Sequence, residues 1–158
     1  KGAFDAPLKG RNFERGRDMF TLAGCIRCHN IEGTGGSVGA DLSKVAEDYP
    51  GAELLHQILD PSARIKDEHR VVAVFLKNEN RYKGMIVKRE GDVLHLAENL
   101  QEPGKTVPIQ KADIVKMVPS DISPMPTGLL VMMQREEILD LLAYLASKGD
   151  KAHKAFAK

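Results

Sequence analysis

The stretch GCIRCH at residues 24–29 decides how this chain folds. It contains the only two cysteines of the 158-residue sequence, separated by two residues, and a histidine follows the second cysteine directly. C-x-x-C-H is the pattern of c-type haem attachment, in which both thiols bond to the porphyrin and the neighbouring imidazole lies under the iron. The motif therefore predicts one covalent haem c on Cys25 and Cys28, with His29 as an axial ligand of the iron.

Two other uses of a C-x-x-C pair fit this sequence less well. A thioredoxin-like redox pair is expected within a βαβ pattern, which is missing around residues 25–28. A zinc site needs further ligands, and the sequence has neither a second C-x-x-C nor an H-x-x-x-H. Haem attachment is therefore the interpretation that the sequence favours.

Composition and charge narrow the class of protein further. Hydrophobic residues make up 42% and charged residues 28%, as in an ordinary globular protein. The net charge of +1, without a Lys/Arg cluster, argues against nucleic acid as a partner. No stretch approaches the ~20 apolar residues of a membrane span. The opening KGAFD carries no signal peptide, as expected of a mature or trimmed chain.

An amphipathic helix is expected at residues 12–23, directly before the attachment motif. Asn12 is a suitable N-cap and Gly24 is placed to end the helix. Helical spacing is indicated by Phe13, Gly16, Arg17 and Phe20. This helix would deliver the two thiols to the haem.

The segments that follow are expected to alternate between loop and helix. The glycine-rich residues 30–43 predict a loop that wraps close to a haem face. Residues 51–59 predict a short helix, and the leucine spacing of residues 138–145 predicts a final one. The polar tail at 150–158 is expected to be frayed or solvent-facing.

Between these helices the pattern changes to strands. Short β-rich runs separated by turn signals predict five strands: 71–76, 81–88, 93–97, 106–109 and 114–118. Five strands in about fifty residues indicate a small antiparallel sheet or barrel.

The second axial ligand has to be chosen among six methionines and four further histidines. Met125 is favoured because Pro124 and Pro126 stiffen its loop and keep it out of helix and sheet. The other methionines are expected to fill the core: Met19, Met85, Met117, Met132 and Met133. A second histidine stays open as the alternative ligand: His56, His69, His95 or His153.

These motifs together resemble class I cytochrome c. In that family the first and last helices cross at a glycine and pack against an aromatic residue, for which Gly16 and Tyr144 are the matching positions. The family also has a Gly-Pro pair whose carbonyl accepts a hydrogen bond from the proximal histidine. Gly39-Ala40 matches it here, with alanine in place of proline, so the resemblance implies a bond from His29 that fixes its tautomer.

Nearly the whole chain is similar to a haem-binding domain common in planctomycete-type bacteria. The matching features are Asp60-Pro61-Ser62, the β-rich segment, SPMPTGL at 123–129 and EILDL at 137–141. The resemblance implies a mainly α cytochrome c fold with a small antiparallel β insertion, α+β overall. Residues 1–67 and 120–158 would form the haem domain, and residues 68–119 the insertion. Such domains are often fused to dehydrogenases, so this chain could be one module of a longer protein.

The function implied is outer-sphere electron transfer by a haem ligated by His29 and Met125, without enzyme activity of its own. Its partners would be a dehydrogenase as electron donor and a terminal acceptor, in the periplasm or on an outward-facing membrane-attached protein. One alternative is a gas sensor or peroxidase-like protein with a labile sixth ligand. In another alternative, the β insertion has the main functional role, as a docking module or a gate over the haem. The competing interpretation is that the insertion is purely structural.

Overall fold

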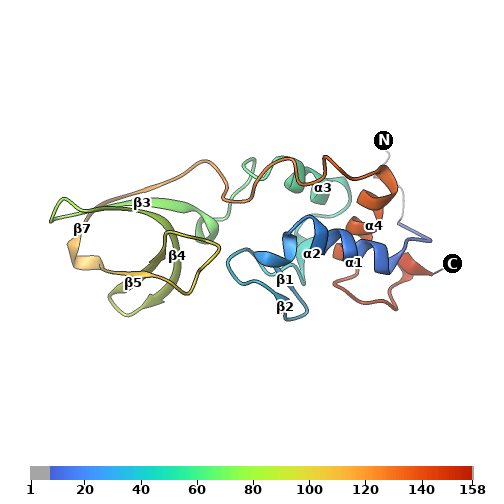
Figure 1. The fold of residues 1–158 in the computed structure, drawn as a ribbon, viewed down its shortest axis with the longest axis horizontal. Helices are drawn as coiled ribbons and strands as arrows, with labels where there is room; N and C mark the ends of the chain where they lie inside the picture. The colour runs from blue at the N-terminus through green and yellow to red at the C-terminus, as the bar shows by residue number, and fades with distance from the viewer. Residues whose placement is uncertain (1–7, 158) are drawn as a thin grey trace. The chain divides into compact units, whose positions relative to one another are not determined.

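A computed structural model describes residues 8–157, which divide into two compact units (Figure 1). The first unit comprises the residues up to 61 and those from 126 onward, and the second comprises residues 62–125. The segment 68–119, expected as an insertion, lies within the second unit.

The first unit is built from short helices and one very small hairpin. Its helices and strands are α1 (Phe13–Leu22), β1 (Asn30–Ile31), β2 (Thr34–Gly35), α2 (Val45–Asp48), α3 (Ala52–Leu59) and α4 (Arg135–Ala146), with the 3₁₀ turns η1 (Cys25–Arg27) and η4 (Lys154–Phe156). The helices expected from apolar spacing are confirmed as α1, α3 and α4. The β1–β2 hairpin lies in residues 30–43, for which the sequence predicted a loop, and α2 lies just after them, where the sequence predicted no element.

Both ends of α1 form as the sequence predicts. The side chain of Asn12 accepts a hydrogen bond from the backbone N–H of Arg15, which satisfies one of the unpaired donors at the helix start. Gly24 has a φ of +77°, a left-handed conformation that glycine adopts without steric cost and that ends the helix. Because Gly24 adjoins Cys25, the end of α1 sets the position of the first thiol.

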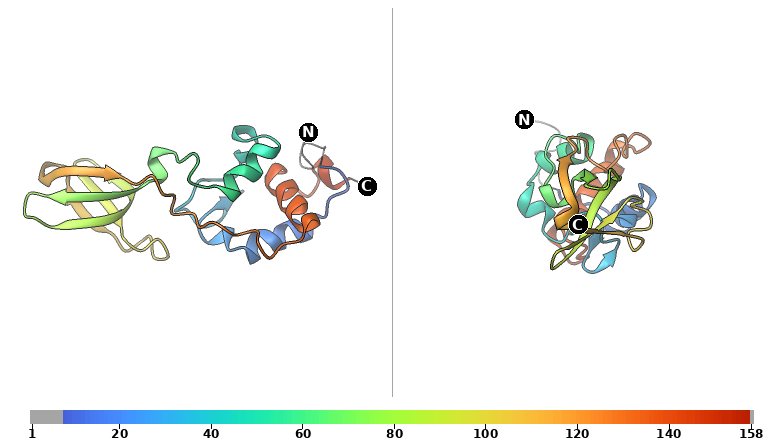
Figure 2. Two further views of the ribbon diagram at one scale, coloured as in Figure 1. Left: turned by 90° about the horizontal axis from the view of Figure 1, so that it is seen from above. Right: turned by 90° about the vertical axis from the view of Figure 1, so that its left-hand side faces the viewer.

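Helices α1 and α4 lie side by side (Figures 1 and 2). Their backbones come into close contact at Gly16. A Cβ at Gly16 would overlap the backbone carbonyl oxygen of Asp140, and it would lie 2.9 Å from Cβ of Tyr144. The rings of Phe20 and Tyr144 pack beside this point with centroids 5.7 Å apart. The glycine crossing with an aromatic neighbour, implied by the resemblance to class I cytochrome c, is therefore confirmed.

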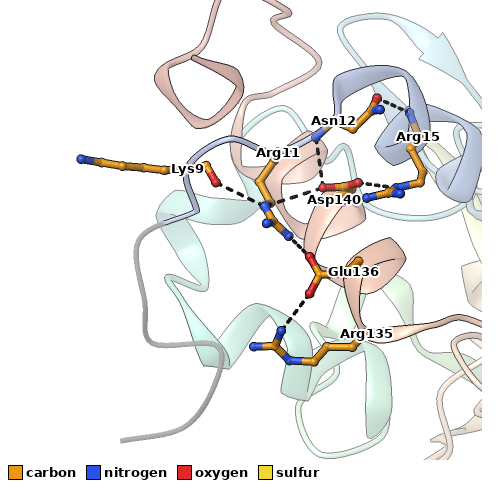
Figure 3. Close-up of polar contacts among 7 residues, drawn as sticks. All are labelled: Lys9, Arg11, Asn12, Arg15, Arg135, Glu136 and Asp140. Atoms are coloured by element: carbon orange, nitrogen blue, oxygen red, sulfur yellow. Dashed lines mark hydrogen bonds and ion pairs between the residues drawn. The ribbon is translucent and has the colours of Figure 1, made fainter. Parts of the chain in front are cut away.

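A buried carboxylate reinforces the same contact (Figure 3). Asp140 has a fully buried position on α4, and its carboxylate accepts hydrogen bonds from Nε of Arg15 at 2.5 Å and from the backbone N–H of Asn12 at 3.0 Å. Nε of Arg11 lies 3.8 Å from the same carboxylate. The charge is thus placed at the positive end of the α1 dipole and paired with arginine, which offsets the cost of burying it.

The expectation of a frayed or solvent-facing tail is wrong for part of the tail: residues 150–152, Lys154 and Ala157 are exposed, but Ala155 and Phe156 pack against the start of α1. Ala155 is 2% exposed, and its carbonyl accepts a hydrogen bond from the backbone N–H of Arg11 at 2.9 Å. The ring of Phe156 packs edge-on against Phe13, with centroids 5.2 Å apart. The polar composition of the tail concealed these few apolar contacts, which hold it against the start of α1.

The second unit is an antiparallel sheet of five strands, as the sequence predicts. They are β3 (Val71–Leu76), β4 (Arg81–Glu90), β5 (Val93–Ala97), β6 (Val107–Gln110) and β7 (Ile114–Pro119), preceded by the 3₁₀ turn η2 (Asp67–His69), with η3 (Lys111–Asp113) between β6 and β7. Their order in the sheet is β6-β5-β4-β3-β7. Inward-facing side chains form the core of this unit: Val72, Val74, Leu96 and Ile109.

Strand order explains why this sheet curls. Strands β6 and β7 stand at opposite edges, and four strand spacings of about 4.8 Å would separate the edges of a flat sheet by about 19 Å. Only η3 connects them, and a 3₁₀ turn of this length spans about 8 Å. The edges must therefore approach each other, which gives the partly closed barrel seen in Figure 2.

The expectation of a mainly α fold is wrong. Among residues 8–157, helices, with the 3₁₀ turns included, account for 31% and strands for 23%, and this part of the chain contains four α-helices and a five-stranded sheet. The helices are short, and α2 is a single turn. The five strands of the sheet form a compact unit with its own core. No helix within residues 8–157 is both long and apolar enough to cross a lipid bilayer.

Three exposed ion pairs tie together segments of the first unit that are far apart in the sequence. They are Glu14–Lys151 at 2.8 Å, Glu47–Lys148 at 2.5 Å and Glu136–Arg11 at 2.7 Å. In each pair, the hydrogen bond from the basic partner is the main cause that lowers the pKa of the glutamate. The folded state therefore favours the ionised carboxylates.

Replacing Gly16 with alanine should destabilise the protein. The added methyl group would overlap the α4 backbone, and such overpacking costs about 1–3 kcal/mol, more than the ~1 kcal/mol that alanine contributes as a better helix former. Thermal unfolding followed by helical circular dichroism measures the loss. Gly104→Ala is the matched control, because a Cβ there has no neighbour within 4 Å. An unchanged unfolding temperature for Gly16→Ala would contradict the crossing.

Acid should weaken the first unit in a way that depends on the three glutamates. Their pKa values are lower in the folded state, so their stabilisation is complete above the ordinary pKa of 4.5 and is lost as the pH falls through the folded values. The unfolding temperature should fall less steeply between pH 5 and 3 in the triple variant E14Q/E47Q/E136Q than in the wild type. An equal fall of the unfolding temperature in both proteins would show that these ion pairs do not stabilise the folded state.

Candidate haem site

The attachment motif forms a single tight turn directly after α1. The backbone N–H groups of Cys28 and His29 both donate to the carbonyl of Cys25, at 3.2 and 2.9 Å. Both thiols are free and partly exposed. Burial raises the pKa of the Cys25 thiol to about 11, so this group is protonated at neutral pH before it reacts. The turn thus presents two thiol side chains and one imidazole from five consecutive residues.

The glycine-rich loop wraps this turn closely. The N–H of Gly36 donates to the carbonyl of Ile26 at 2.8 Å, and the N–H of Gly39 donates to that of Cys28 at 2.7 Å. A Cβ at Gly36 would overlap the carbonyl of Arg27. The loop can approach the turn this closely only because residue 36 is a glycine. The sequence predicted that this loop wraps a haem face, and the structure shows that it wraps the attachment turn.

The orientation of the His29 ring is fixed by a backbone carbonyl. Nδ1 of His29 lies 2.7 Å from the carbonyl oxygen of Ala40. A carbonyl can only accept a hydrogen bond, so Nδ1 carries the proton and Nε2 has the form that binds a metal. The bond implied by the resemblance is therefore confirmed, and alanine supports it in place of proline. Such a bond also raises the basicity of the ligand.

Gly39 holds the face of the same ring. A Cβ at this position would lie 2.6 Å from Cε1 and 2.7 Å from Nδ1 of His29. Contacts this short do not occur between real atoms, so the backbone at Gly39 lies against the imidazole in the space that a side chain would take. The ring is thus held at its edge by Ala40 and on one face by Gly39.

The residues present fit a covalent haem. Two thiols and an imidazole with the required tautomer come from one turn, and thioether bonds with a histidine ligand are the donor set of haem c. The first unit also leaves large apolar side chains exposed, including Leu22 at 76% and Leu59 at 56%. A large apolar cofactor needs such side chains around it.

Met125 is the last residue of the second unit and is half-buried. Its backbone N–H donates to Oγ of Ser123 at 3.2 Å. The prediction that the other methionines fill the core is confirmed for Met85, which is 4% exposed. It is wrong for Met117 and Met132, which are 41% and 91% exposed, because both occupy positions that face outward.

The four rival histidines occupy varied settings. His56 is exposed on α3, and His69 is the last residue of η2. Nε2 of His95 lies 3.3 Å from the carboxylate of Glu90. His153 caps η4 by accepting a backbone N–H at 3.2 Å. The contacts of His95 and His153 are thus with neighbouring protein groups in their own parts of the chain.

The sequence placed Gly39 in the wrapping loop and in the Gly39-Ala40 pair but did not predict its contact with the His29 ring, and it assigned no role to Ser123. A glycine directly before the carbonyl-bearing Ala40 could have indicated a close approach to the ring. A serine two residues before Met125, with proline between, has the spacing of a side-chain-to-backbone turn. Both signals are weak in the sequence alone.

Comparison with known protein families gives one match. The model of the cytochrome c family matches residues 13–90, which is just under half of the chain. The matched range begins with α1, contains the attachment turn and ends with β4, so Met125 and α4 lie outside it. No curated protein sequence matches the chain. The match supports a cytochrome c domain, and with it covalently bound haem c and electron transfer.

Replacing Gly39 with alanine should disturb the proximal ligand. The methyl group would force the loop or the imidazole to move, at a cost of about 1–3 kcal/mol in stability. The haem should stay attached, because both cysteines remain, while the unfolding temperature falls and the reduction potential changes. Gly104→Ala serves as the control, with both quantities as in the wild type. A Gly39→Ala protein with unaltered stability and potential would refute the contact with the ring.

Proposed function

We propose that this chain is a monohaem c-type cytochrome that carries electrons by outer-sphere transfer, with His29 and Met125 as axial ligands. The observation that carries the proposal is the His29 imidazole, held by the Ala40 carbonyl in the turn that bears both thiols. The family match over residues 13–90 supports the same class of protein.

Each residue of the site has a definable part in this function. Haem, when bound, supplies a centre that gains and loses one electron. Cys25 and Cys28 would hold it through two thioether bonds, so that little moves during each cycle. The His29 ring, fixed by Ala40, keeps its orientation. Met125 would close the second axial position with a soft thioether, which favours the reduced state and keeps substrates from the metal.

The proposed setting is an electron-transfer chain outside the cytoplasm. With both axial positions closed, the chain would not itself be an enzyme, and it would pass electrons from a dehydrogenase to a terminal acceptor. A periplasmic or outward-facing location is proposed because c-type haem is attached on that side of the cytoplasmic membrane. The resemblance to domains fused to dehydrogenases is the support for that partner.

Replacing Met125 with alanine tests the ligand assignment. The ferric holoprotein should lose the weak red-edge absorption band of a sulfur–iron bond, and its reduction potential should fall by on the order of 0.1 V or more. Met132→Ala is the matched control, because this side chain is 91% exposed, and it should leave band and potential unchanged.

Two results would count against the proposal. If Met125→Ala keeps the band and the potential, another side chain is the sixth ligand. If carbon monoxide binds readily to the native ferrous protein at neutral pH, the sixth position is labile, as in a gas sensor or a peroxidase-like protein.

A further inference from the structure

The loop that carries Met125 is tied to the segment that enters the second unit. The chain enters this unit at residue 62 and leaves it at residue 125. The backbone N–H of Ser123 donates to Oγ of Ser62 at 3.0 Å, across 61 positions of sequence. Ser62 follows the Asp60-Pro61 pair that ends α3. The two crossing segments are thus joined just before the methionine.

Ser123 connects this tie to the methionine itself. While its N–H bonds to Ser62, its Oγ accepts the backbone N–H of Met125 at 3.2 Å. A serine hydroxyl that accepts from the residue two positions on forms a compact turn. Pro124 and Pro126 have no N–H and a fixed φ, so they limit the backbone on both sides of Met125. The hydroxyl of Ser123 and the two rings therefore determine the conformation of the loop.

Further hydrogen bonds join the same two segments nearer to strands β3 and β7. The guanidinium of Arg70 donates to the carbonyl of Ser120 at 2.9 Å and contacts the carboxylate of Asp121 at 3.4 Å. The backbone N–H of Ser120 donates to the carbonyl of Val71 at 2.8 Å. These bonds start at the strands and hold the segment up to residue 121. The Ser62–Ser123 bond joins the two segments closer to Met125 than these bonds do.

We infer that Ser62 and Ser123 are positioning residues for Met125, which hold its backbone in the conformation that presents the thioether to the iron. The inference rests on the proposed function, since it assumes that Met125 is an axial ligand. With either bond removed, the loop would sample other conformations and the sulfur would leave the metal more often. The folded core of the second unit would not change, because neither serine belongs to it.

Competition with free imidazole measures how often the sixth position is open. Imidazole can bind the ferric holoprotein only while Met125 is dissociated, so its apparent affinity follows the open fraction. One hydrogen bond is worth about 1 kcal/mol, or about fivefold. Ser123→Ala and Ser62→Ala should each bind imidazole about fivefold more tightly than the wild type, with a weakened sulfur–iron band. Ser123→Thr keeps the hydroxyl and should restore wild-type affinity.

Ser120→Ala is the matched control for this experiment. Oγ of Ser120 accepts the backbone N–H of Ile122 at 3.1 Å, which is the same kind of turn three residues earlier in the same segment, without a link to Met125. Its imidazole affinity should stay within twofold of the wild type. An equal increase in Ser120→Ala would mean general loosening of the segment and would overturn the inference.

The failure of this inference is distinguishable from failure of the proposed function. If Met125→Ala loses the sulfur–iron band but Ser123→Ala and Ser62→Ala bind imidazole as the wild type does, the ligand assignment stands and the positioning role is refuted. If Met125→Ala keeps the band, the ligand assignment itself fails, and the inference falls with it. If Ser123→Ala yields no holoprotein, Ser62→Ala and Ser123→Thr decide the question by the same measurement.

Discussion

The close approach of two backbones at Gly16 is the constraint on which the rest of the first unit depends. Any side chain at this position would push α1 away from α4. The attachment turn begins directly after α1, so the position of the thiols follows from the position of that helix. Asp140 adds a buried charge to the same contact and pairs it with Arg15 at the start of α1. A helix near the end of the chain thereby places a motif near its beginning.

The proximal half of the site could be predicted because its determinants are local. Five residues contain both thiols and the imidazole, and the carbonyl of Ala40 is only eleven positions further on. A backbone carbonyl is present whatever the side chain, which is why the bond survives the exchange of proline for alanine. Met125 differs, since its choice rested on flanking prolines and on resemblance, and nothing local connects it to His29. Its role stays a proposal.

Other features could not be predicted because they depend on contacts between distant segments. The five strands and their antiparallel sheet or barrel were predicted, but they were counted as a small insertion in a mainly α fold. Strand signals alone do not show that the sheet forms a compact unit with its own core. The packed part of the tail was missed because Phe156 contacts Phe13, which lies at the other end of the sequence. Asp140 stands within a leucine-rich run, and no periodicity indicates that a carboxylate there will be buried between two arginines.

The bond between Ser62 and Ser123 also has a consequence for folding. Closing a flexible loop of about sixty residues costs roughly 2–3 kcal/mol more entropy than closing one of a few residues. Once the barrel has folded, its two ends are already within hydrogen-bond distance, so the helical part closes as if the connection were very short. A sheet folding ahead of the helices would therefore lower their loop-closure cost. Lengthening or shortening the strands at the end of the sheet away from Ser62 and Ser123 would leave this loop-closure cost unchanged.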